Sequence, residues 1–105
     1  MTTQAEIINQ LKALEALSQQ GGYSDILASS LRKIINQEKE NIQQQIKELE
    51  NDLQAFEQQY QLSSVDFYQQ FKTGQLGDEA DFVEWSAFYQ MLSDLEARLM
   101  LLKSC

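Results

Sequence analysis

The feature that most constrains this chain is the near absence of residues that break a helix. Proline does not occur, and the four glycines fall in two places, at Gly21 and Gly22 and at Gly74 and Gly77. Proline lacks the backbone donor that a helix needs, and glycine costs backbone entropy. A length of 105 residues suits one domain. We therefore expect a single helical domain over residues 1–105, made of long segments between the glycines.

Within these segments, apolar side chains recur every three or four residues, which is the period of one face of an α-helix. Residues that can cap a helix stand before each segment: Thr3, then Ser24 or Asp25, then Ser63 or Ser64, then Asp78. The glycine pair permits a positive φ angle, so the chain can reverse there into a helical hairpin. The expected helices cover residues 4–19, 25–60, 64–73 and 79–103.

Two of the expected helices contain heptad seams, in which apolar residues alternate in steps of three and four. The seam residues are Ile42, Ile46, Leu49, Leu53 and Phe56 in the second helix and Trp85, Phe88, Leu92, Leu95 and Leu99 in the fourth. The second helix would be about 52 Å long, which exceeds a compact domain of this size. We expect an all-α fold, an elongated coiled-coil-like hairpin or bundle around one long central helix. We also expect a homodimer through the seams, and a change of packing near residues 36–41, which lack apolar side chains.

Charge and hydropathy limit the possible partners. Sixteen acidic and eight basic side chains give a net charge of −8, which repels a nucleic-acid backbone and favours a basic protein, although acidity can also serve solubility alone. The longest apolar run, residues 99–102, is far shorter than the roughly 20 residues of a membrane span. The N-terminus does not resemble a secretory signal. We expect a cytoplasmic protein without direct nucleic-acid or membrane contacts, and an inert thiol at Cys105.

Residues that could support catalysis are scarce. The chain has no histidine, one terminal cysteine and no glycine-rich phosphate loop. Four carboxylates, Asp78, Glu79, Asp81 and Glu84, could in principle bind a hard cation, but they lack the spacing of an EF-hand loop. Acidic residues at a helix start are better explained by the helix dipole. We therefore expect no enzyme activity and no cofactor or metal.

Seven of the ten aromatic side chains lie within residues 67–89. This concentration has two interpretations, a local core or a pocket for a partner, because aromatic side chains are also enriched at interface hot spots. Trp85 and Phe88 lie on the leucine seam, which favours a core role. Phe82 and Tyr89 fall beside the seam, and with Phe67 and Phe71 they are the residues that we expect to bind a partner.

Residues 71–85, FKTGQLGDEADFVEW, resemble small acidic helical proteins that act as antitoxins in prokaryotic toxin–antitoxin modules. The resemblance covers residues 63–95. It implies a non-catalytic regulator that binds and occludes a basic, toxin-like enzyme. The alternative is a structural coiled-coil adaptor or a small assembly subunit that inhibits no enzyme.

Overall fold

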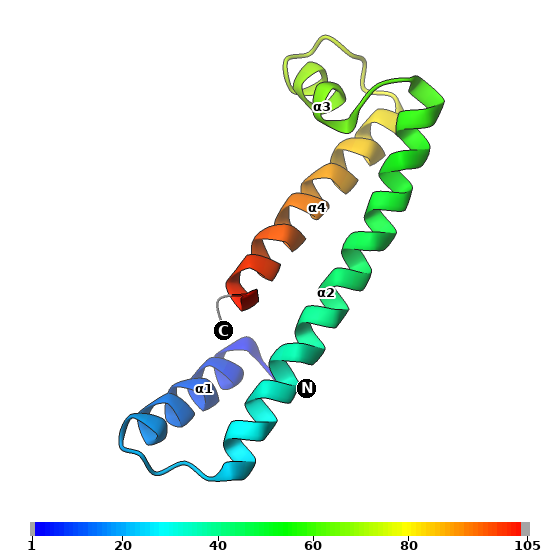
Figure 1. The fold of residues 1–105 in the computed structure, drawn as a ribbon. Coiled ribbons are helices and arrows are strands. Elements are labelled where there is room, and N and C mark those ends of the chain that lie inside the picture. The colour runs from blue at the N-terminus through cyan, green and yellow to red at the C-terminus, as the bar shows by residue number, and fades with distance from the viewer. Residues whose placement is uncertain (1, 104–105) are drawn as a thin grey trace. The chain divides into compact units, whose positions relative to one another are not determined.

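The computed structural model describes residues 2–103, and these residues form four helices and no strand (Figure 1). The helices are α1 (Gln4–Gln19), α2 (Asp25–Tyr60), α3 (Ser64–Lys72) and α4 (Ala80–Lys103). Helix α3 ends one residue earlier, and α4 begins one residue later, than the sequence predicts. The all-helical fold is confirmed, whereas the expectation for Cys105 lies outside the described residues.

Three of the helices begin with the capping bonds expected from the sequence. The hydroxyl of Thr3 accepts a hydrogen bond from the Glu6 backbone N–H at 3.2 Å. Ser24 accepts in the same way from Leu27 at 3.2 Å, and Ser63 from Asp66 at 3.1 Å. Each bond satisfies one backbone donor that the first helical turn leaves unpaired, so these polar residues determine where α1, α2 and α3 start.

The ends of three helices share one type of termination, with a left-handed residue just past the helix. Gly21 has φ 76° and Gly74 has φ 78°, and the N–H of the following residue returns to a carbonyl five positions earlier. This pattern is the Schellman motif. At the end of α2 the same bond runs from the Leu62 N–H to the Glu57 carbonyl, and Gln61 occupies the left-handed position with φ 53°. A residue with a side chain adopts that conformation at a cost.

Contacts divide the chain into two compact units, Met1–Ile35 and Asn36–Cys105, although α2 is a continuous helix across their boundary. The boundary falls at the start of the 36–41 stretch that lacks apolar side chains. We call the described parts the hairpin unit (residues 2–35) and the C-terminal unit (residues 36–103).

In the C-terminal unit, the seam of α2 packs against the seam of α4. One cluster of buried side chains joins Ile42 and Leu49 to Leu95 and Leu99, with Ile46, Phe88 and Leu92 partly buried beside it. A second cluster joins Leu53 to Phe67 and Trp85, with Phe56 at its edge. The heptad seams therefore form a core within one chain. Dimerisation remains a prediction.

The hairpin unit differs in having no buried residue. Its α1 and the first turns of α2 are joined by the reversal at Gly21 and Gly22 (Figure 1). A Cβ atom added to Gly22 would lie 3.0 Å from Cδ1 of Leu17, so the turn packs closely against the end of α1. Leu14, Leu27, Leu31 and Ile35 are half-buried, and the other large apolar side chains of this unit are exposed.

Candidate protein-binding surfaces

Aromatic side chains form a layered core around Trp85, which has no exposed surface. The indole ring stacks on Phe67 with 3.8 Å between ring centroids and 3° between ring planes, and on Phe56 with 5.4 Å between centroids. Tyr60 lies 5.8 Å from the indole. Such contacts add about 0.5–1.5 kcal/mol per pair to the burial of the rings. Trp85 is therefore a core residue, as its position on the seam predicts.

Ser64, at the start of α3, links three helices through hydrogen bonds. Its hydroxyl accepts a bond of 2.9 Å from the indole Nε1–H of Trp85. Its backbone N–H donates a bond of 2.8 Å to the carboxylate Oε2 of Glu57, which belongs to α2. Because a buried indole N–H without an acceptor would be costly, these two bonds fix where α3 docks.

A second polar contact joins the end of α2 to the start of α4. The Tyr60 hydroxyl donates a hydrogen bond of 2.6 Å to Oδ2 of Asp81. This bond to the carboxylate raises the pKa of the Tyr60 phenol above its ordinary value of 10.0, and desolvation and the nearby charges of Asp81 and Glu79 act in the same direction. One member of the predicted acidic cluster thus has a structural partner.

The four residues predicted to bind a partner have different environments. Phe67 is fully buried against Trp85, so its assignment as a partner contact is wrong. Phe82 and Phe71 are half-buried, and their rings lie 5.7 Å and 5.5 Å from that of Phe67. Tyr89 is half-buried and lines a surface groove.

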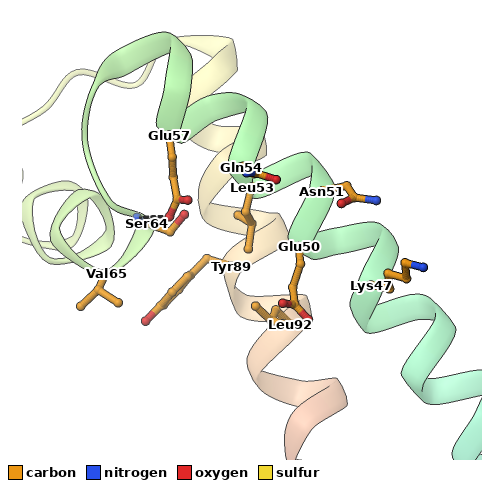
Figure 2. Close-up of a pocket in the computed structure, with 10 residues that line it drawn as sticks. All are labelled: Lys47, Glu50, Asn51, Leu53, Gln54, Glu57, Ser64, Val65, Tyr89 and Leu92. Carbon is orange, nitrogen blue, oxygen red and sulfur yellow. Dashed lines mark hydrogen bonds between the residues drawn. The ribbon is translucent and has the colours of Figure 1, made fainter.

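This groove lies among α2, α3 and α4 and has a volume of about 480 Å³ (Figure 2). Its lining residues are Lys47, Glu50, Asn51, Leu53, Gln54, Glu57, Ser64, Val65, Tyr89 and Leu92. The Tyr89 ring extends from α4 toward the start of α3, where Val65 lies exposed (Figure 2). The groove thus combines an apolar floor with two carboxylates and one amine at its margin. We call it the Tyr89 groove.

Tyr89 also borders a second hollow, of about 310 Å³, with Tyr68, Gln90, Ser93 and Asp94. The rings of Tyr68 and Tyr89 lie 4.7 Å apart. The Tyr68 hydroxyl accepts a hydrogen bond of 2.9 Å from the Gln90 amide, and the Lys72 amine lies 5.5 Å from the Tyr68 ring. These contacts orient both tyrosines without burying them, so a pair of half-exposed aromatic rings separates two hollows.

The sequence did not mark Tyr68 and Val65 as candidate contacts. Both belong to α3, which has nine residues, and the apolar residues of so short a helix do not show which side docks on the protein. One sequence signal could have indicated them. Phe67 and Phe71 are four residues apart and therefore lie on one face of the helix, whereas Val65 and Tyr68 lie outside that face.

In a different groove between α2 and α4, all the charged side chains of the lining are acidic. Two adjoining hollows, of about 190 and 250 Å³, share Asp52 and Phe88. Glu48, Glu84, Gln45 and Gln59 complete the polar margin, and no basic side chain lines either hollow. Met91 is exposed at one end. Apolar side chains within this groove and carboxylates at its margin would suit a basic, amphipathic segment of a partner protein.

The described residues contain neither a metal-binding cluster nor a helix that could span a membrane. Within residues 2–103, no three histidine, cysteine or carboxylate side chains are gathered as a metal site requires. The helices in the same range are too polar or too short to cross a bilayer. Comparisons of the chain with protein-family models, with curated proteins and with solved structures gave no match.

Proposed function

We propose that this protein is a non-catalytic, cytoplasmic regulator that binds a basic enzyme directly and occludes it, in the manner of an antitoxin. The observation that carries this proposal is the distribution of charge. Residues 36–105 contain thirteen of the sixteen acidic side chains and five of the eight basic ones, so this part of the chain carries the whole net charge of −8. Such a field attracts a basic protein and accelerates its encounter.

The Tyr89 groove is the docking site within this field. Tyr89 and Tyr68 present aromatic area that is already held in place, and ordered tyrosines are frequent binding hot spots. Glu50 and Glu57 lie at the margin of the groove, where they can pair with lysine or arginine side chains of the partner. Glu57 keeps one oxygen on the Ser64 N–H, so its position is fixed before binding.

The experiment begins with purification from the native host and mass spectrometry of the chains that co-elute. The purified partner is then titrated with the wild-type protein and with the Tyr89→Ala variant, and both its binding and its own activity are measured. We expect Tyr89→Ala to weaken binding by about 2 kcal/mol or more, a factor of roughly thirty. Binding should also weaken as salt concentration rises.

A matched control is Val83→Ala, which removes an exposed side chain from the same helix outside the groove. It should leave affinity unchanged. An acidic partner, or equal affinities for wild type and Tyr89→Ala, would contradict the proposal.

The alternative function is a structural adaptor, and the exposed apolar hairpin unit favours it, because an adaptor needs a second binding surface. The same titration distinguishes the two. An adaptor would bind its partner without changing the partner's activity.

A further inference from the structure

The hairpin unit leaves most of its large apolar side chains exposed to water. None of its side chains is buried. Twelve large apolar side chains are exposed among residues 2–103, and seven of them belong to this unit. They are Ile7, Ile8, Leu11, Leu17, Tyr23, Ile26 and Ile34. Concentrated apolar exposure of this kind marks an interaction surface, whereas single exposed apolar residues do not.

Local structure cannot compensate for this exposure. Helix α1 has 16 residues, little more than the about 12–15 residues below which an isolated helix is marginal in water, and most helical stability in proteins comes from tertiary packing. The caps at Thr3 and Gly21 define the ends of α1, but each contributes only about 1 kcal/mol. The best-packed large apolar residues of the unit are only half-buried; they are Leu14, Leu27, Leu31 and Ile35. A second apolar surface is needed to form a core.

Charge favours a second copy of this chain as the occupant of this surface. Residues 1–35 carry three acidic and three basic side chains, Glu6, Glu15 and Asp25 against Lys12, Arg32 and Lys33. A neutral surface has no attraction for the basic partner that the C-terminal unit suits, nor for anionic lipid, whose interfacial helices are rich in lysine and arginine. A second copy of the same hairpin meets no net repulsion there, whereas two C-terminal units at −8 each repel one another.

We propose that the hairpin units of two copies of this chain pack their exposed apolar faces together into an antiparallel four-helix bundle. Two helices from each copy supply four, and a twofold arrangement places the same patch on both sides of the interface. The dimer contact thus lies in the neutral unit, and the acidic unit of each copy remains free. The inference does not depend on the identity of a regulated partner.

The test is the mass of the full chain in solution by multi-angle light scattering, at low and high micromolar concentration. The wild type should approach twice the chain mass of 12.1 kDa. Leu11→Glu in α1 and Ile34→Glu in α2 replace side chains that are 54% and 56% exposed, so neither should unfold the chain. Each should weaken dimerisation by at least about tenfold, because it places an unpaired charge in the interface.

The control is Val83→Glu in α4, whose side chain is 51% exposed. It adds the same charge to the C-terminal unit and should leave the dimer intact. Fluorescence of Trp85, the chain's only tryptophan, reports separately that the C-terminal unit stays folded in every variant. The dimer should also persist or strengthen in concentrated salt, which screens repulsion between the acidic units.

Three outcomes would overturn the inference. The wild type could remain a monomer at every concentration. Leu11→Glu and Ile34→Glu could leave the dimer as stable as Val83→Glu does. The hairpin could instead bind lipid, which would appear as co-sedimentation of wild type, but not of Leu11→Glu, with phosphatidylcholine–phosphatidylserine vesicles in the absence of a dimer.

Discussion

Among single residues, Trp85 combines complete burial, three aromatic neighbours and a buried hydrogen bond in the C-terminal unit. We predict that Trp85→Ala lowers the free energy of unfolding by about 3–5 kcal/mol, the usual cost of removing a buried tryptophan. Urea denaturation followed by circular dichroism measures this change. Trp85→Phe keeps an aromatic ring and loses the indole donor to Ser64, so its cost should be smaller. A Trp85→Ala variant with unchanged stability would exclude the core role.

Tyr60 makes stability depend on pH in the alkaline range. Its hydrogen bond to Asp81 raises the pKa of the folded phenol above the ordinary value of 10.0, so the unfolded chain loses this proton first. The bond therefore stabilises the fold below pH 10.0, and this contribution disappears as the pH rises through the folded pKa. We predict that alkaline pH lowers the melting temperature of the wild type more steeply than that of Tyr60→Phe. Identical slopes would show that the bond does not couple to folding.

The roles of these residues were predictable to different degrees. Trp85 lies on a heptad seam, and the seam alone indicates burial. Phe67 could not be assigned in this way, because α3 is too short for its period to show which face docks. The bond between Ser64 and Trp85 joins residues 21 positions apart, and no local pattern encodes such a contact.

Among the helices, boundaries followed closely from the sequence, because caps and glycines act through bonds within a few residues. The end of α2 is the exception. Gln61 terminates that helix in a left-handed conformation, a role usually filled by glycine, and glutamine carries no signal for it. Sequence reasoning could place this end only by the break in the apolar pattern.

This helix end supplies a prediction for α2. Glycine and alanine at position 61 both lose the 2.7 Å bond from the side-chain amide to the Gln58 carbonyl. Glycine also removes the left-handed strain of about 1–2 kcal/mol, but its greater freedom favours the unfolded chain by about 0.5–1 kcal/mol. We therefore expect Gln61→Gly to be more stable than Gln61→Ala by about 0.5–1 kcal/mol, observed as a higher urea midpoint. Equal stability of the two variants would mean that backbone strain at this position is not relieved by glycine.

For the molecule as a whole, the sequence indicated the seams, the total charge and a change of packing near residues 36–41, but not what covers each seam. A seam shows that a face is buried, and it does not show whether the same chain or a second copy covers it. The structure pairs the seams of α2 and α4 within one chain. The apolar side chains of α1 also recur at helical spacing, yet none of them is buried.

The two units should consequently differ in stability, and the difference should depend on protein concentration. Amide protons exchange readily where few buried contacts oppose local opening. Helix α1 has no buried residue, whereas α4 has four, so at low concentration we predict fast exchange in α1 and slow exchange in α4. As the protein concentration rises, self-association should slow exchange in α1, because binding stabilises the folded form by mass action. The exchange rate of α4 should not change. Hydrogen exchange with mass spectrometry measures both helices in one sample. Slow exchange in α1 at every concentration would show that the hairpin is stable without a second copy.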